Sequence, residues 1–205
     1  FKAAQEGKLK GFDLPGTLSL AGRTRIEPLE SRNVVARLPG SDAALAAEHI
    51  AHTAHLDHIG IGAAVKDEQG VGDRIYNGAL DNALGIAILL EAARALQAEP
   101  PRRSVLFLAT TAEEKGLLGA FHYARAPTVP LDSLVANVNM DMPIILTPLS
   151  DAIPIGIEHS SLQGMVERVA KELGIALTPD PFPEEVVFIR SDQYAFIRAG
   201  VPAVY

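Results

Sequence analysis

Hydrophobic residues follow two different patterns along this chain, one typical of strands and the other of helices. Residues 104–111 (Ser-Val-Leu-Phe-Leu-Ala-Thr-Thr) form a continuous apolar run, which is the pattern of a buried central strand. Residues 81–98 instead place apolar side chains at helical spacing from Leu84 to Ala95, in a stripe broadened by neighbouring leucines and isoleucines. A stripe of that width predicts a helix that packs against a sheet.

The same patterns predict strands that alternate with helices along most of the chain. Such alternation is typical of an α/β fold, here a three-layer sandwich with a mixed, mostly parallel central sheet flanked by helices. Residues 60–80 are rich in Gly, Asp and Asn, and we expect them to form a long loop, a kind of segment that is often functional. The expected strands are 33–38, 48–55, 104–111, 134–140 and 201–205, and the expected helices are 81–98, 117–124, 160–173 and 191–198.

The chain has 205 residues, which is enough for one domain with a sizeable core. Residues 1–30 have mixed polarity and several turn formers, so we expect one or two short edge strands and a linker there. Residues 31–205 then form the main domain. The chain starts on Phe1 and stops on a strand-like apolar run at Tyr205, and we expect further sequence of this domain beyond that point.

Composition narrows the possible functions. Hydrophobic residues make up 48% of the chain and charged residues 21%, as in ordinary globular proteins. The formal net charge of −7 argues against a nucleic-acid partner. The sequence has no cysteine, so a metal site would have to use His, Asp and Glu side chains. No apolar run is long enough for a membrane span.

The stretch Thr53-Ala-His-Leu-Asp-His58 places two imidazoles and a carboxylate where an expected strand opens into a loop. Catalytic groups of open α/β sheets gather at such strand ends. His55 followed by Asp57 suits a metal ligand that is oriented by a nearby carboxylate. A solvated surface loop is the commoner explanation for a short His-rich stretch taken alone.

Further acidic residues follow other expected strands or open a helix. Each has a simple structural explanation: Asp81 as a helix N-cap, Glu113 and Glu114 as first-turn helix residues, and Asp141 as a solvated loop residue. In a parallel sheet, however, these positions share one edge with His55. Carboxylates brought so close repel one another and need a cation to balance them. Nitrogen and oxygen ligands suit zinc or, less selectively, manganese or cobalt.

Five short blocks in a fixed order carry a family resemblance. They are Ala54-His-Leu-Asp-His58, Tyr76-Asn-Gly-Ala-Leu-Asp-Asn82, Thr111-Ala-Glu-Glu-Lys-Gly116, Asn139-Met-Asp141 and Arg190-Ser-Asp192. From Ser31 to Tyr205 the chain resembles the co-catalytic di-zinc exopeptidase family. That family includes secreted bacterial leucine aminopeptidases, glutamate carboxypeptidase and, more distantly, glutaminyl cyclase and transferrin receptor. Residues 1–30 resemble the junction to a protease-associated insert, which is absent from this chain.

The resemblance implies the zinc ligands. His55 and Asp141 would bind the first Zn²⁺, Asp81 would bridge both ions, and Glu114 would bind the second. The family takes a final His for the second zinc from a loop past the last strand, so we expect that site to be incomplete in a chain that stops at Tyr205.

The resemblance also implies roles around the metal. Glu113 would be the general base, Asp57 would orient His55, and the peptide bond between Asp81 and Asn82 would be cis. Gln193 stands where close relatives often carry His after Ser-Asp, which alters the expected substrate contacts.

The function implied is that of a zinc-dependent aminopeptidase acting on peptides with a free N-terminus, in an extracellular or periplasmic setting. One alternative is a single-zinc acyltransferase of the glutaminyl cyclase type, in which Glu113 would serve as acid and base. The other is an inactive binding homologue like transferrin receptor. Such a homologue should have lost ligands, yet four of the five expected zinc ligands and the base are present.

Overall fold

The computed structural model describes residues 1–11, 13, 15–66, 72–145 and 147–205, and it divides into two compact units, Phe1–Glu30 and Ser31–Tyr205. In the first unit the regular element is the short helix α1 (Lys2–Gln5). The short strands expected there are not formed in the described residues of this unit. Every one of those residues is exposed, so no apolar burial offsets the entropy of ordering a strand.

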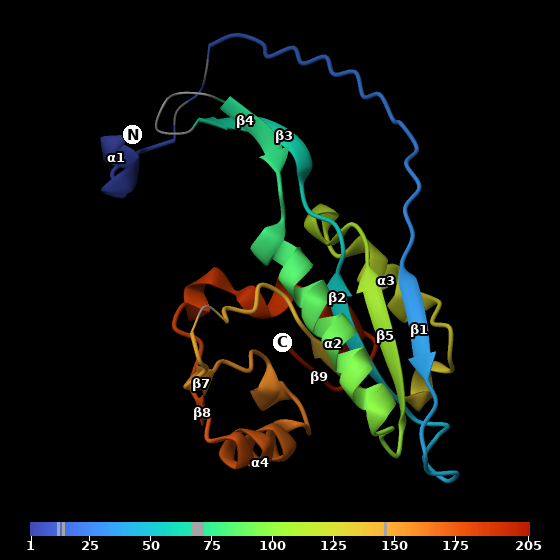
Figure 1. The fold of residues 1–205 in the computed structure, drawn as a ribbon. Coiled ribbons are helices and arrows are strands. Elements are labelled where there is room, and N and C mark those ends of the chain that lie inside the picture. The colour runs from blue at the N-terminus through green and yellow to red at the C-terminus, as the bar shows by residue number, and fades with distance from the viewer. Residues whose placement is uncertain (12, 14, 67–71, 146) are drawn as a thin grey trace. The chain divides into compact units, whose positions relative to one another are not determined.

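A five-stranded sheet forms the centre of the second unit, in the order β1-β5-β2-β6-β9 (Figure 1). The edge strand β1 runs antiparallel to β5, and the remaining neighbours pair in parallel. This confirms the predicted mixed, mostly parallel sheet. The strands are β1 (Val34–Leu38), β2 (His49–His55), β5 (Ser104–Thr110), β6 (Leu134–Asn139) and β9 (Ala203–Val204).

Helix α2 (Leu84–Ala98) covers one face of this sheet. Its buried residue Leu89 packs in a cluster with Ala54 of β2 and with Val105 and Phe107 of β5. The two β5 residues are two positions apart and therefore point to the same face. The broad apolar stripe of the predicted helix is the surface that lies on the sheet.

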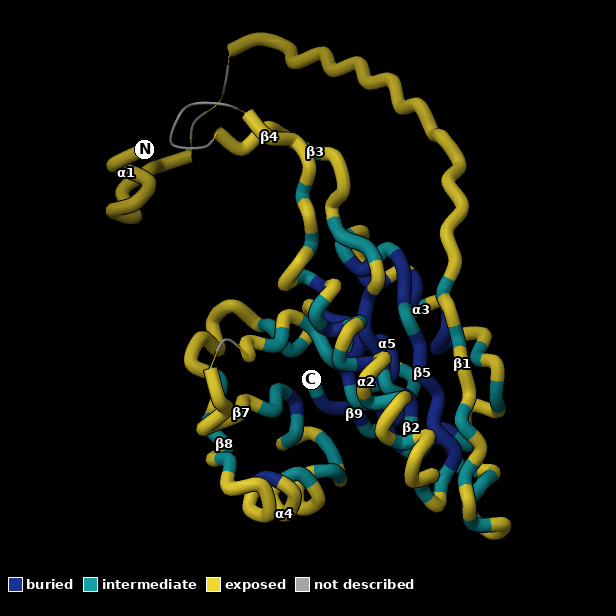
Figure 2. The backbone as a smooth tube through the Cα atoms, in the orientation of Figure 1, coloured by how far each residue is buried: buried dark blue, intermediate teal, exposed yellow. Residues whose placement is uncertain are grey.

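The opposite face is covered by α3 (Leu118–Arg125) and α5 (Gln193–Arg198). Tyr123 and Phe196 from these helices form a buried cluster that includes Leu106 of β5. Full burial of one such leucine contributes roughly 1.5–3 kcal/mol. With helices on both faces, the unit is the predicted three-layer sandwich. Figure 2 shows the central strands buried between the two helical layers.

The long loop expected before α2 was a wrong prediction. Strands β3 (Gly60–Lys66) and β4 (Gly72–Tyr76) form an antiparallel hairpin, which is exposed to solvent (Figure 2). The Gly and Asp residues of this segment suggested a loop, but its β-branched residues pair across the hairpin, such as Ile61 opposite Ile75. Residues 67–71 of the expected loop lie outside the described part of the chain.

The start of the main helix also differs from the prediction. Regular α-helix begins at Leu84 and follows a π-helical turn over Ala79–Ala83. Within that turn Asp81 and Asn82 have non-helical backbone angles. Asp81 makes no side-chain capping hydrogen bond, so the N-cap explanation of this residue does not hold. The peptide bond between Asp81 and Asn82 is cis, as the resemblance implied.

The remaining elements lie outside the central sheet. Helix α4 (Gln163–Leu173) ends at Gly174, whose φ of 69° is the left-handed conformation expected after a helix. It lies beside a short parallel pair, β7 (Asp151–Ala152) and β8 (Ala176–Leu177). Within the described ranges, no helix has both the length and the apolarity needed to cross a membrane. Short 3₁₀ turns span Glu113–Lys115, Leu131–Ser133, Ile157–His159, Pro183–Glu185 and Val187–Ile189.

Candidate functional site

Three parallel strands end at one edge of the sheet and bring the candidate residues together. In the register of β2 and β5, His55 lies opposite Thr110, and in that of β2 and β6, Thr53 lies opposite Asn139. The chain leaves β5 and β6 just past these positions. The acidic residues that follow each strand, Glu113, Glu114 and Asp141, therefore start from the same edge as His55.

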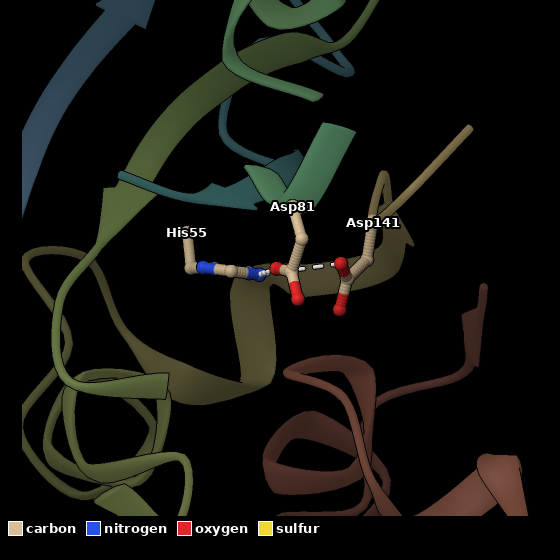
Figure 3. A group of neighbouring side chains, drawn as sticks. All are labelled: His55, Asp81 and Asp141. Carbon is tan, nitrogen blue, oxygen red and sulfur yellow. Dashed lines mark hydrogen bonds and ion pairs between the residues drawn. The ribbon is translucent and has the colours of Figure 1, made fainter. Parts of the chain in front are cut away.

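His55, Asp81 and Asp141 form the tightest group of candidate ligands (Figure 3). His55 Nε2 lies 3.0 Å from Asp81 Oδ1 and 3.2 Å from Asp141 Oδ1, and the imidazole is 1% exposed. Zinc bonds of roughly 2.0–2.1 Å in a tetrahedral site put neighbouring ligand atoms about 3.3 Å apart. The spacing of these three side chains therefore fits a zinc ion.

The other ring nitrogen of His55 fixes which atom can face a metal. Nδ1 lies 2.8 Å from the backbone carbonyl of Asp57, and because a carbonyl can only accept, Nδ1 is the donor. Nε2 is then the nitrogen that points at Asp81 and Asp141. Asp57 does hold His55, but through its backbone and not through the carboxylate that the sequence pattern suggested.

The Asp57 carboxylate has a different task. Its two oxygens accept the backbone N–H of Ala112 at 2.9 and 2.7 Å. Ala112 has a φ of 55°, a left-handed conformation that costs a non-glycine residue on the order of 1–3 kcal/mol. The hydrogen bonds to Asp57 offset that cost and fix the turn that presents Glu113 and Glu114.

A chain of buried hydrogen bonds positions the Asp141 carboxylate. Ser191 Oγ donates to Asp141 Oδ2 at 2.5 Å and accepts from Asn139 Nδ2 at 2.7 Å. Thr53 Oγ1 in turn donates to Asn139 Oδ1 at 2.7 Å. The sequence pattern marked the block containing Ser191 but gave no role to its hydroxyl. That hydroxyl leaves Oδ1 of Asp141 to face His55.

Replacing Ser191 by Ala is therefore expected to weaken zinc binding without unfolding the protein. Loss of a partner that orients a metal ligand typically lowers metal affinity about 10–100-fold. Competition with a chromophoric chelator measures that change. Ser133→Ala is a matched control, because Ser133 donates to the Pro130 carbonyl near the opposite ends of the strands, and its zinc affinity should equal that of the parent. Equal affinity in the Ser191 variant would contradict this role.

Asn82 ties the start of α2 to the end of β6. Its side-chain amide donates to the Met140 carbonyl at 2.9 Å, and its Oδ1 accepts from Gly85 N–H at 3.1 Å. Only glycine fits at position 85, since a Cβ there would lie 2.3 Å from Asn82 Oδ1 and 2.5 Å from the Met140 oxygen. This close contact sets the position of Asp81 relative to Asp141.

A second group of candidate ligands lies on the other side of Asp81. His58, Asp81 and Glu114 each offer one ligand atom, and these atoms all lie within 4.8 Å of one another. His58 Nδ1 is 2.5 Å from Glu114 Oε1 and 3.7 Å from Asp81 Oδ2. Sequence reasoning named His58 as part of the His-rich stretch but assigned it no ligand role. Its position after a strand end was the signal that could have identified it.

The electrostatics of the site follow from its crowded carboxylates. Burial alone lowers the pKa of His55, but the hydrogen bond and negative charge of Asp141 outweigh it and raise that pKa to about 9. Burial raises the pKa of Glu113 to about 8, although the charge of His55 opposes the shift. Burial and the charges of Glu114 and Asp141 also raise the pKa of Asp81. In the absence of a cation, the raised pKa values favour the protonated forms of His55, Glu113 and Asp81, and binding of a metal ion would release those protons.

The donor set fits zinc on two counts. Imidazole nitrogens and carboxylate oxygens are ordinary zinc ligands, and His55, Asp81 and Asp141 are already spaced for them. In addition, His58 Nδ1 and Glu114 Oε1 are buried atoms with no hydrogen-bond partner among the described residues, which is unusual for polar groups unless they bind a ligand. Glu113 completes the site as a buried carboxyl that can exchange a proton near neutral pH.

Comparison with known proteins places this arrangement in a family. The sequence profile described as Peptidase family M28 matches residues 33–205. Aminopeptidase YwaD of Bacillus subtilis is 41% identical over 66 residues, which cover 32% of this chain and 14% of that protein. A probable zinc metalloprotease of Pyrenophora tritici-repentis is 40% identical over 65 residues, 32% of this chain and 15% of that protein. The chain thus matches only a small part of the length of these relatives.

Solved structures share the fold. A zinc aminopeptidase from Bacillus subtilis aligns with a TM-score of 0.62 at 24% identity, over 84% of this chain and 38% of that one. A zinc-dependent exopeptidase from Parabacteroides distasonis aligns with a TM-score of 0.65 at 19% identity, over 86% and 63% of the two chains. A glutaminyl cyclase from Bacteroides thetaiotaomicron gives 0.60 at 20% identity, over 84% and 62%. These three enzymes therefore share the sandwich fold with this chain.

Proposed function

Because the chain belongs to peptidase family M28, we propose that it is a zinc-dependent aminopeptidase that removes N-terminal residues from peptides. The observation that carries the proposal is the group of His55, Asp81 and Asp141 at zinc spacing. The buried carboxyl of Glu113 accompanies that group, and its pKa responds to the charges of His55 and Asp141. A metal site with an adjacent proton acceptor is the arrangement that metal-assisted hydrolysis of an amide bond uses.

His55, Asp81 and Asp141 would hold the zinc, which when bound supplies a Lewis acid for the scissile carbonyl and acidifies water. Glu113 is the group that takes a proton from the attacking water and later delivers it to the leaving amine. Burial raises the pKa of Glu113 to about 8 in the metal-free protein, and the positive charge of a bound zinc ion would lower it, so that the ionised carboxylate can accept the proton. Asp57 and Ser191 position these groups.

Exopeptidase selectivity follows from the charge of the site. With one zinc ion bound and neutral imidazoles, the carboxylates of Asp81, Glu113, Glu114 and Asp141 leave the site with net negative charge. A free α-ammonium group on the substrate supplies the missing positive charge, whereas an acylated N-terminus does not. The proposed enzyme therefore prefers peptides with a free N-terminus.

A panel of aminoacyl-p-nitroanilides, each paired with its N-acetylated form, tests the proposal. The expected result is zinc-dependent hydrolysis of the free-amine compounds, with kcat/KM at least about tenfold lower for the acetylated ones, a difference of about 1.4 kcal/mol. A glutaminyl-peptide in the same assay tests the acyltransferase alternative. Cyclisation to pyroglutamyl-peptide with release of ammonia, and no hydrolysis of the panel, would replace the proposal with that alternative. Zinc binding without either reaction would favour the binding homologue.

Zinc binding is expected to release about one to two protons per ion at pH 7, since a coordinated imidazole must be neutral. His55, with a pKa of about 9, and Glu113, with a pKa of about 8, both hold protons at that pH in the metal-free protein. Zinc affinity should therefore rise with pH, by up to about tenfold per unit for each proton released, and level off near pH 9. Titration calorimetry in buffers of different ionisation enthalpy counts the protons. A proton count of zero would exclude His55 as a ligand.

A further inference from the structure

We propose that Gln193 is a positioning residue of the metal site, which ties the turn Val187–Ile189 to the hydrogen bonds that orient Asp141. The inference rests on the proposed function, because Asp141 is one of the ligands that would hold the zinc there. It gives position 193 a role different from the substrate contact that the sequence suggested. The side chain of Gln193 is 0% exposed, so it lies too deep to touch a bound peptide.

Gln193 begins helix α5, and its side-chain amide has one partner in each of two neighbouring segments. Its nitrogen Nε2 donates to the backbone carbonyl of Phe188 at 2.8 Å, in the turn that precedes the helix. Because a carbonyl can only accept, this contact fixes the orientation of the amide. The oxygen Oε1 then faces Asn139 on strand β6, whose Nδ2 donates to it at 3.4 Å. One buried side chain thus links the turn to the central sheet.

Asn139 connects Gln193 to the metal ligand. Its Nδ2 carries two hydrogens, and besides Gln193 it donates to Ser191 Oγ at 2.7 Å. Ser191 in turn donates to Asp141 Oδ2 at 2.5 Å. Asn139 and Ser191 are 5% and 2% exposed, so water does not readily replace a lost partner. The plane of the Asn139 amide, and with it the position of the Ser191 hydroxyl, therefore depends on Gln193.

The turn on the other side of Gln193 forms part of the wall of a cleft of about 530 Å³. The Phe188 ring packs against Gly156 so closely that a Cβ there would lie 2.6 Å from Phe188 Cε2. The same ring meets that of His159, with 5.0 Å between the centres and an angle of 63° between the planes. Gln193 therefore connects a packed wall of this cleft to the metal site.

Replacing Gln193 by Leu, which has a similar volume but no polar side-chain atoms, tests the link. Zinc affinity, measured by competition with a chromophoric chelator, is expected to fall about tenfold, the lower end of the range for groups that orient a metal ligand. Tyr123→Phe is the matched control, because it removes one hydrogen bond of another buried side chain, to Thr128 at 3.0 Å. It should lower the stability as well but leave the zinc affinity at the parent value. A Gln193→Leu protein that loses stability and keeps the zinc affinity of the parent would overturn the proposal.

Gln193→His provides a second test, with the residue that close relatives often carry at this position. A neutral imidazole can donate with one nitrogen and accept with the other, as Gln193 does, whereas an imidazolium can only donate. The zinc affinity of this variant should equal that of the parent to within about twofold at pH 8, where an imidazole is neutral. At a pH low enough to protonate the introduced imidazole, as judged from its ¹⁵N shifts, the affinity should fall towards that of Gln193→Leu.

Each affinity in this titration is compared with that of the parent at the same pH. The titrating groups that both proteins share near the site are His55, Glu113 and Asp192, with pKa values of about 9, 8 and 6. Their contributions cancel in the ratio of the two affinities. A ratio that stays constant while the introduced imidazole becomes protonated would overturn the proposal, whatever the result for Gln193→Leu.

Hydrolysis of the aminoacyl-p-nitroanilides separates failure of this inference from failure of the proposed function. Weakened zinc binding by Gln193→Leu, together with no hydrolysis by the zinc-loaded parent, would overturn the proposed activity and leave the role of Gln193 intact. Zinc-dependent hydrolysis by the parent, together with equal zinc affinity in the parent and both variants at every pH, would overturn that role and leave the activity intact.

Discussion

Replacement of Glu113 by Gln is expected to lower kcat by about 10²–10⁴-fold while zinc content stays that of the parent, because this carboxyl transfers protons and does not bind metal. Gln has the same shape but cannot accept a proton from water. At 9% exposure, Glu113 lies where bulk water would not readily replace it as a base. Steady-state kinetics on an aminoacyl-p-nitroanilide and elemental analysis of the dialysed variant give the two measurements.

Glu114→Gln is the informative comparison. Glu114 lies against His58 in the second ligand group, so this variant should lose zinc, with the loss of activity following from it. Added zinc should restore part of the activity of Glu114→Gln and none of that of Glu113→Gln. The reverse pattern would mean that the roles of the two neighbouring glutamates have been exchanged.

Apolar patterning predicted the framework of the fold because burial decides it. The run over β5 is apolar on both faces, and the structure buries Val105 and Phe107 under α2 and Leu106 under α3 and α5. The exposed hairpin β3–β4 escaped prediction because it buries little. Its pairing depends on register and turn geometry, and those leave only a weak trace in the order of polar and apolar residues.

The candidate site could be predicted as a set of residue types at strand ends, but not as a set of contacts. Parallel strands bring His55, Glu113 and Asp141 to one edge whatever the loops do. The contacts depend on loop backbone, which the sequence does not display. The Asp57 carboxylate therefore accepts a hydrogen bond from Ala112, and the Asp57 backbone carbonyl accepts one from His55. The two-residue spacing of His55 and Asp57 in the sequence does not reveal which of these groups contacts the imidazole.

The contacts of His58 and Ser191 also could not be predicted from the sequence. Both stand in blocks that the sequence marked, yet one lies beside Glu114 and the other donates to Asp141 only because distant segments meet. Residues separated by 50 positions or more make these contacts. Sequence order places a residue on an element, whereas its partner is set by how the elements pack.

Asp81→Ala is expected to be the most damaging single change to a carboxylate, since Asp81 faces both His55 and His58. Zinc content after dialysis should fall below one ion per chain. The kcat/KM should fall by on the order of 10³-fold or more, about 4 kcal/mol of transition-state stabilisation. Asp132→Ala, at an exposed carboxylate in a 3₁₀ turn, should match the parent in both measurements.

The stability of this variant, measured with a chelator and with zinc, tests whether Asp81 acts as a metal ligand. Burial and the charges of Glu114 and Asp141 raise the pKa of Asp81 in the folded chain, so its ionised form binds protons more tightly than in the unfolded chain. The free energy of unfolding then falls as pH rises through the carboxylate range, so the charge of the ionised Asp81 lowers the stability of the metal-free protein at neutral pH. Without metal, Asp81→Ala should be at least as stable as the parent at pH 7, and with zinc it should be less stable. A loss of stability that is equal with and without zinc would contradict the role of Asp81 as a ligand.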